Sequence, residues 1–302
     1  MKMKQHRVAR RSLLLTGLVV GLTAGLAPAA QALSVTITEF PVPTAGGGAL
    51  DITAGPDGNL WFTEGTGNKI GRITTAGTIT EYPVPTANSI PHDITMGPGG
   101  NLWFTEIKSN QIGRITPAGV ITEYPVPTAN SRPNDITAGP GGLWFTENAG
   151  NKIGRITPAG AITEYPVPTP SSGPDGITRG PGGLWFTERN GNKVGRMTIT
   201  TGAVTEYPVP TASSGPHDIT VGPHGGLWFT ELAGNKIGHI SPRGEHTVTE
   251  FPVPAASSSP FGNLFAITAA PHSGYLWFTE GAANKIGRLG EGPARSAFPV
   301  SQ

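Results

Sequence analysis

A five-residue sequence, LWFTE, recurs six times along the chain and constrains its fold more than any other feature. Each copy is followed by a close variant of NKIGR and, in five of the six, then by ITEYPVP or a variant of it. The tryptophans of the six copies are spaced 41 to 49 residues apart: Trp61, Trp103, Trp144, Trp185, Trp228 and Trp277. A period near 42 residues is typical either of two-helix repeats or of the four-stranded blades of a β-propeller.

Glycine and proline decide between these two architectures. The 302 residues include 44 glycines and 30 prolines, which recur between apolar runs and would interrupt a helix every few residues. Each unit contains four short runs rich in β-branched and aromatic residues, DIT, LWFTE, KIGRIT and ITEYPVP. We therefore predict an all-β fold, a six-bladed β-propeller of four-stranded antiparallel blades.

The two ends of the repeat region suggest how the ring of blades closes. Residues 34–43 (SVTITEFPVP) have the sequence of a fourth strand, and the sixth repeat ends with KIGRL at 285–289 without a full fourth strand. We predict that the N-terminal strand completes the last blade, because this removes two exposed strand edges. Residues 297–300 (AFPV) are a second candidate for the same edge.

The first 32 residues have the pattern of an export signal. A basic segment, MKMKQHRVARR, precedes a short apolar stretch and the small-x-small motif Ala30-Gln31-Ala32. The pair Arg10-Arg11 fits a twin-arginine signal, and a general secretory signal fits as well. We predict an export signal at 1–32 and a single propeller domain at 33–302, secreted by either route and not inserted in a membrane after cleavage.

Charge and cysteine content exclude several classes of partner and site. Five of the 21 basic residues lie in the predicted signal, so the remaining chain has 16 basic and 20 acidic residues and a formal charge of −4. This balance argues against a nucleic-acid partner. The chain has no cysteine, which excludes disulfides and thiolate metal sites. We expect a monomer that binds a small molecule or a peptide.

One position of the repeat varies while its surroundings do not. It lies immediately before the innermost strand, on the rim that also carries the end of the second strand, so we expect a ligand to bind there. The six residues at this position are Leu50, His92, Asn134, Asp175, His217 and Phe265. A longer loop in the sixth blade adds Phe261, and we predict a ligand rim of Asn134, Asp175, Phe261 and Phe265.

Residues present in nearly every blade are explained more simply as scaffold. We expect the tryptophans to pack between blades. We expect Asp51, Asp93, Asp135 and Asp218, which begin the innermost strands, to bond to neighbouring backbone. The glutamate that ends each LWFTE should contact the lysine or the backbone of the following turn.

With these motifs, the chain resembles the streptogramin B lyases over residues 35–289. The resemblance implies a secreted enzyme of antibiotic resistance that opens a cyclic depsipeptide by elimination across a threonyl ester C–O bond. It also implies a magnesium ion and a histidine as general base. Such chemistry is reasonable, since an imidazole accepts protons at neutral pH and a divalent ion stabilises an enolate.

Two histidine–glutamate pairs match part of the site that this resemblance implies. Pro216-His217 precedes Glu231, and Pro91-His92 precedes Glu106, and in both cases the glutamate lies fourteen positions after the histidine. We assign His217 as the base and Glu231 as a magnesium ligand or orienting group, with His92 and Glu106 as the second choice. The chain departs from the family in having six repeats where relatives have seven blades. It also has Ile90 and Gly215 where the family has a glutamate two residues before one histidine.

Two further functions stay open beside the lyase. A non-catalytic propeller of the cell envelope or medium would use the variable rim as a rigid binding platform. A hydrolase could use the same rim, and its product would contain an added water.

Overall fold

The computed structural model describes residues 38–254, 264–269, 275–280 and 285–290, which are built almost wholly from β-strands. The chain divides into two compact units, residues 1–40 and 41–302, and every described strand belongs to the second. The predicted export signal lies outside the described residues. In the described part of the chain, no helix has the length and apolar character needed to cross a membrane.

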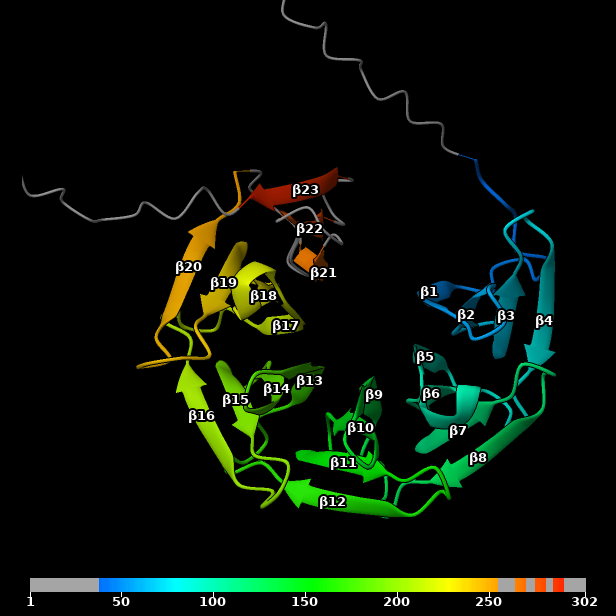
Figure 1. The fold of residues 1–302 in the computed structure, drawn as a ribbon, viewed down its shortest axis with the longest axis horizontal. Coiled ribbons are helices and arrows are strands. Elements are labelled where there is room, and N and C mark those ends of the chain that lie inside the picture. The colour runs from blue at the N-terminus through cyan, green and yellow to red at the C-terminus, as the bar shows by residue number, and fades with distance from the viewer. Residues whose placement is uncertain (1–37, 255–263, 270–274, 281–284, 291–302) are drawn as a thin grey trace, which may run out of the picture. The chain divides into compact units, whose positions relative to one another are not determined.

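The strands form six antiparallel sheets, and within each sheet the strands pair in chain order (Figure 1). Five sheets have four strands, and the sixth has three among the described residues. The strands of the first three blades are β1 (Ala49–Ala54), β2 (Leu60–Glu64), β3 (Lys69–Ile73), β4 (Ile79–Pro83), β5 (Pro91–Met96), β6 (Leu102–Glu106), β7 (Gln111–Ile115), β8 (Ile121–Pro125), β9 (Pro133–Gly139), β10 (Gly142–Glu147), β11 (Lys152–Ile156) and β12 (Ile162–Pro166). Those of the last three are β13 (Pro174–Gly180), β14 (Gly183–Glu188), β15 (Lys193–Met197), β16 (Val204–Pro208), β17 (Pro216–Val221), β18 (Leu227–Glu231), β19 (Lys236–Ile240), β20 (Val248–Pro252), β21 (Leu264–Ala269), β22 (Tyr275–Glu280) and β23 (Lys285–Gly290). Two short 3-10 turns, η1 (Pro98–Gly100) and η2 (Pro223–Gly225), connect the first and second strands of blades two and five.

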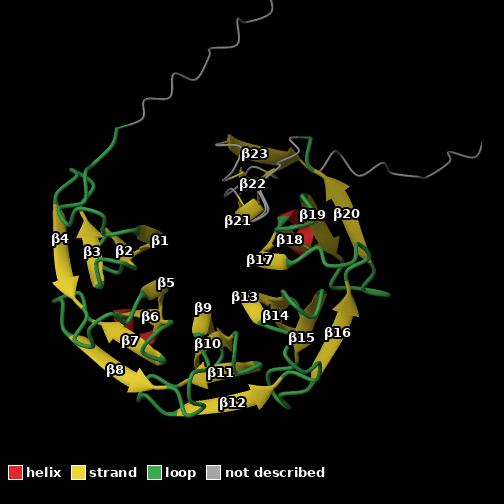
Figure 2. Ribbon diagram, turned by 180° about the vertical axis from the view of Figure 1, so that it is seen from behind, coloured by secondary structure: helices red, strands yellow, loops and turns green. Residues whose placement is uncertain are grey.

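The first strand of each blade faces a common centre, and the fourth strand lies outermost (Figure 2). Successive first strands pack against each other from β1 and β5 through β17 and β21. The predicted six-bladed all-β propeller is therefore confirmed. Within the described ranges, no comparable packing joins β21 to β1.

The predicted closing strand is not formed in the part of it that the structure describes. Residues 38–43 are in no strand, residues 34–37 lie outside the described residues, and so does the alternative segment 297–300. Thr44 instead bonds to the outer strand of blade one, where its N–H and hydroxyl donate to the Glu81 carboxylate at 2.8 and 2.9 Å. Thr86 makes the same two bonds to Glu123 of blade two. The segment thus follows the repeat, leading into blade one as residues after β4 lead into blade two.

The pairing of the second and third strands explains why LWFTE and KIGR recur in the repeats. Trp144 pairs with Arg155 across β10 and β11, and the guanidinium lies 5.6 Å from the indole centroid. Tyr165 of the fourth strand packs on the same indole with ring centroids 5.6 Å apart. Phe145 pairs with Gly154, where a Cβ would lie 2.1 Å from the phenyl ring. The glycine of KIGR is therefore required by the phenylalanine of LWFTE.

The core lies between blades, as predicted, and it contains five of the six tryptophans, whereas Trp277 of the sixth blade is 38% exposed. Trp61 and Ile70 of blade one pack with Ile94, Leu102 and Phe104 of blade two, and all five are buried. The same cluster recurs at the following junctions. Burying such side chains contributes roughly 1.5–3 kcal/mol each, so these junctions supply most of the stabilisation.

The outer junctions are held by polar side chains of the repeat. Asn110 of the NKIGR-like turn donates to the carbonyls of Val126 and Thr128 and accepts the N–H of Ser131. It therefore fixes the loop that leads to the next blade. Lys152 bonds to Glu164 at 2.7 Å and to the Thr128 hydroxyl, which joins blades two and three.

Replacing Gly154 by alanine should destabilise the fold through the clash with Phe145. We expect Gly154→Ala to lower the free energy of unfolding by about 1–3 kcal/mol, the usual cost of overpacking a core. Chemical denaturation followed by tryptophan fluorescence measures it. The double variant Gly154→Ala, Phe145→Leu should lose less stability than the two single variants lose together, because the smaller leucine side chain leaves room for the methyl group. Full stability of Gly154→Ala would contradict this packing.

Candidate functional site

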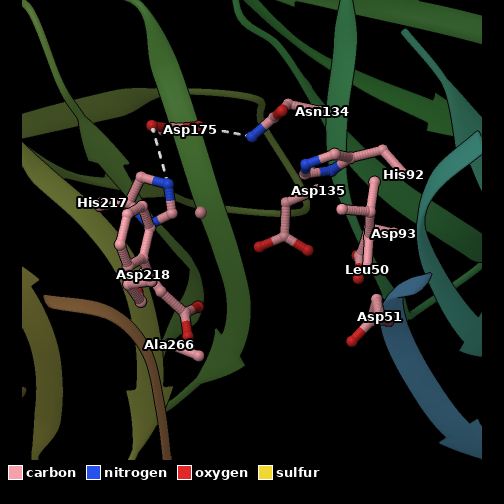
Figure 3. Close-up of a pocket in the computed structure, with 12 residues that line it drawn as sticks. Leu50, Asp51, His92, Asp93, Asn134, Asp135, Asp175, His217, Asp218 and Ala266 are labelled. Atoms are coloured by element: carbon pink, nitrogen blue, oxygen red, sulfur yellow. Dashed lines mark hydrogen bonds and ion pairs between the residues drawn. The ribbon is translucent and has the colours of Figure 1, made fainter. Parts of the chain in front are cut away.

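A pocket of about 460 Å³ lies at the centre of the six blades (Figure 3). Each blade contributes two adjacent residues of its first strand. The lining consists of Leu50, Asp51, His92, Asp93, Asn134, Asp135, Asp175, Gly176, His217, Asp218, Phe265 and Ala266. All six residues at the variable position of the repeat are among them, so the position predicted to face a ligand does line a pocket.

Four aspartates in this lining act as scaffold, as predicted. Each accepts the backbone N–H of an isoleucine in the next blade, at 2.7 to 3.0 Å. The bonds join Ile94 to Asp51, Ile136 to Asp93, Ile177 to Asp135 and Ile267 to Asp218. Burial raises the pKa of Asp218 to about 7, and burial with the charges of Asp135 and Asp51 raises that of Asp93. These carboxylates tie adjacent blades together at the pocket wall.

Blade four departs from this pattern by one residue. Gly176 stands where four of the other blades have aspartate, and a Cβ there would lie 2.5 Å from the His217 carbonyl oxygen. The carboxylate is found one residue earlier, at Asp175. Because no aspartate reaches across this junction, the Ile219 N–H bonds to Asp218 beside it at 2.8 Å. Glycine at 176 therefore permits the close approach of the backbones of blades four and five, and the carboxylate of blade four lies at the variable position of the pocket as Asp175.

The Asp175 carboxylate lies next to side chains from three blades. Its side chain is 5% exposed, and Asn134 donates a hydrogen bond from Nδ2 to Oδ1. Arg189 Nη1 and His217 Nε2 each lie 3.8 Å from Oδ2. Burial raises the pKa of Asp175, while the charges of His217 and Arg189 oppose the rise. Figure 3 shows Asn134 and His217 directed at the carboxylate from either side.

His217 is held by its other ring nitrogen. Nδ1 lies 3.1 Å from the carbonyl oxygen of Phe265, and the Phe265 ring meets the imidazole edge to face at 6.1 Å. A carbonyl oxygen only accepts hydrogen bonds, so Nδ1 carries the proton in this contact. Nε2 is thereby the nitrogen that faces Asp175 and the pocket.

His92 lines the same pocket from blade two (Figure 3). Its Nδ1 is buried and has no hydrogen-bond partner in the described part of the chain. Both candidate histidines therefore reach one pocket, although they come from blades two and five.

The glutamates predicted as their partners lie elsewhere. Glu231 is opposite Pro216 in the strand register. Because a bulge lies between Pro216 and Ile219, the side chains of Glu231 and His217 point in different directions. Its side chain packs beside Ser214 and Gly234 in the turn and is fully buried. Glu106 has the same place opposite Pro91, where Ser109 donates to it at 2.8 Å. Neither glutamate lines the pocket, so the expected pairs His217–Glu231 and His92–Glu106 do not meet there.

Of the two contacts expected for these glutamates, the one with the lysines of the turns is not formed, whereas the side chains do lie against the turn backbone, as Glu147 does at Gly150. Lys152, Lys193 and Lys236 bond to Glu164, Glu206 and Glu250 of the fourth strands, at 2.7 to 2.8 Å. The LWFTE glutamates are left buried beneath the turns. Burial raises the pKa of Glu147, Glu188 and Glu231 to about 7 and that of Glu106 to about 8.

The predicted ligand rim is present in part. Asn134, Asp175 and Phe265 line the pocket, with Phe265 41% exposed, whereas Phe261 lies outside the described residues. The contact of Arg189 with Asp175 was not predicted from the sequence. The sequence does mark blade four as different: in GPDGIT the aspartate directly follows the proline, whereas in PHDIT and PNDIT it is the second residue after it.

The residues at the pocket do not fit a magnesium site. In the described ranges, no three histidine, aspartate or glutamate side chains are grouped so that they could hold a metal ion. Magnesium takes carboxylate and water oxygens at octahedral positions. Here the scaffold aspartates are bonded to backbone N–H groups, and the proposed ligand Glu231 is buried outside the pocket.

A family model and three solved structures with 38% to 45% identity identify the family. The family model described as "Virginiamycin B lyase family" matches residues 28–271. A crystal structure of virginiamycin B lyase from Staphylococcus aureus is 45% identical, with a TM-score of 0.79 and 85% of each chain covered. A catalytically inactive variant of the same protein, solved with quinupristin, gives the same values. A streptogramin B lyase structure is 38% identical, with a TM-score of 0.74, and the match covers 85% of this chain and 87% of the other.

The buried glutamates should make the fold less stable as pH rises. Their pKa values near 7 in the folded chain compare with about 4.5 when unfolded. Between these values the folded chain keeps protons that the unfolded chain releases, so the free energy of unfolding falls as pH rises from 4.5 to 7. We expect Glu147→Gln, Glu188→Gln to reduce this loss by up to about 3 kcal/mol per site. Denaturation at several pH values tests it.

The matched control is Glu245→Gln, which changes an exposed glutamate. It should leave the pH dependence as in the parent chain. Equal slopes in the parent and in the double glutamine variant would show that these carboxyl groups are not held neutral by burial.

Proposed function

The chain belongs to the virginiamycin B lyase family, and from this premise we propose that it opens a cyclic depsipeptide of the streptogramin B class by elimination. The observation that carries the proposal is the placement of His217 in the central pocket, with Nδ1 held by a carbonyl and Nε2 facing inward. A relative was solved with quinupristin, so a small cyclic peptide is the appropriate ligand class to test.

The pocket offers both apolar and polar groups to such a ligand. Leu50 and Phe265 are 55% and 41% exposed and form apolar edges on blades one and six. His92, Asn134 and Asp175 supply polar groups between them. Apolar surfaces combined with convergent polar groups are typical of sites that orient small ligands.

The proposed step moves one proton and one pair of electrons along the substrate. His217 Nε2 accepts the proton of the threonyl α-carbon, and the electrons of that C–H bond form a double bond to the β-carbon. The bond from the β-carbon to the ester oxygen breaks, and the ester leaves as a carboxylate. No water is consumed, so the linear product has the mass of the cyclic substrate.

Magnesium does not enter this proposal, because the pocket lacks a donor set that suits it. We further propose that the mature chain acts outside the cell, which rests on the export pattern of residues 1–32.

A non-catalytic binding propeller is the second candidate. It is favoured by the location of Glu231 and Glu106 outside the pocket, since both were expected beside the histidines. The same assay separates the candidates: a binder retains quinupristin unchanged, a lyase gives a linear product of unchanged mass, and a hydrolase adds the mass of one water.

Incubating the purified chain with quinupristin tests the function and the base together. We expect a linear product of unchanged mass by liquid chromatography and mass spectrometry. His217→Ala should lower kcat by about 10²–10⁴-fold, the range for loss of a general base. His224→Ala, which alters an exposed histidine outside this pocket, is the control. A His217→Ala variant as active as the parent would remove His217 from the chemistry.

A further inference from the structure

The carboxylate nearest to the candidate base belongs to Asp175, whose Oδ2 lies 3.8 Å from His217 Nε2. We propose that Asp175 is the positioning residue of this site, held by Asn134 and Arg189, and that it supports proton transfer at His217 Nε2 without a divalent metal ion. The role in turnover rests on the proposed function, whereas the effect of Asp175 on His217 can be measured in the free protein.

Asp175 faces the ring nitrogen of His217 that accepts the proton. To act as the base, the imidazole has to carry a single proton before the step, and the 3.1 Å contact with the Phe265 carbonyl places that proton on Nδ1. After Nε2 accepts a second proton, the ring is a cation with Phe265 O at one nitrogen and Asp175 Oδ2, 3.8 Å away, at the other. The carboxylate therefore stabilises the state formed during the reaction more than the state before it, which lowers the barrier.

Asn134 and Arg189 keep this carboxylate in place. Asn134 occupies Oδ1 as a donor, which leaves Oδ2 toward His217. Arg189 Nη1 lies 3.8 Å from Oδ2, and the positive charge favours the ionised form of a carboxyl group that is 5% exposed. The residues at this place in the other described blades are Gly65, Ile107, Asn148 and Leu232, so the cation is particular to blade four.

Arg189 also provides positive charge at a site whose residues do not suit magnesium. Its side chain is 46% exposed, so donors not directed at Asp175 remain accessible from the rim. A guanidinium has five N–H donors and stays charged at all relevant pH values. We therefore expect the chain to depend on Arg189 rather than on an added divalent ion.

The first test needs no turnover. Nitrogen-15 NMR of the histidine rings at pH 6, assigned with His217→Gln, gives the ratio of imidazolium to imidazole at His217. Asp175→Asn should lower this ratio by roughly tenfold, because a neutral amide replaces the carboxylate. Arg189→Ala should lower it as well, because Asp175 loses the positive charge that favours its ionised form. A fall in both variants supports the proposal, and an unchanged ratio in Asp175→Asn overturns it, whatever the activity.

The second test uses quinupristin as the substrate. Asp175→Asn should lower kcat by about 10²–10⁴-fold with KM nearly unchanged, and Asp175→Glu should recover part of the loss. Asp57→Asn and Arg179→Ala are matched controls away from the pocket. Full kcat in a folded Asp175→Asn overturns the positioning role. If the parent chain does not convert quinupristin but the NMR shifts appear, the proposed lyase function fails and the Asp175–His217 pair stands.

The metal-independent part is tested by magnesium chloride alone. Titration to roughly 10 mM, above the weak millimolar range of metal sites, should leave the ring signals of His217 and His92 unmoved. Quinupristin affinity by calorimetry should be equal in chelator and in magnesium. Shifted histidine signals or a tighter complex in magnesium would overturn this part.

Discussion

The junction between adjacent blades is the interaction on which the rest of the structure depends. At each of five junctions the threonine of LWFTE donates its hydroxyl hydrogen to the carbonyl of the variable residue in the next blade, as Thr63 does to His92 and Thr146 does to Asp175. The same hydroxyl accepts an N–H of its own first strand. One buried oxygen thus fixes two strands at the pocket, and the backbone of the variable residue is held whatever its side chain.

That arrangement explains why one position can vary among near-identical repeats. The carbonyl of the variable residue is used by the scaffold, whereas its side chain points to the pocket (Figure 3). Histidine, asparagine, aspartate and phenylalanine all fit at these five junctions, because the bond to threonine involves only the backbone. Substitution there changes the chemistry of the pocket at little cost to the junction.

The repeat predicted the blades, the strands and the buried tryptophans, because period and composition report on local structure and packing. It also predicted which side chains reach the pocket. It misplaced Glu231 and Glu106, since fourteen residues of spacing set the register of two strands but not the bulge that turns His217 away from Glu231. It assigned the lysines to the nearest glutamates, whereas Lys152 bonds to Glu164 twelve residues later. Both errors concern the direction in which side chains point, which cannot be predicted from short sequence motifs.

The site lies at the junction that lacks one scaffold bond. Elsewhere an aspartate reaches across to an isoleucine N–H, but Gly176 cannot, and Ile219 bonds to its own neighbour instead. The missing carboxylate is present one residue earlier as Asp175, where it meets groups from three blades. A local rule of the repeat is therefore broken at the place where unusual chemistry is assembled, as expected when function competes with stability. The threonine bond and the apolar packing still hold this junction, so the loss of one hydrogen bond, worth about 1 kcal/mol, is tolerated.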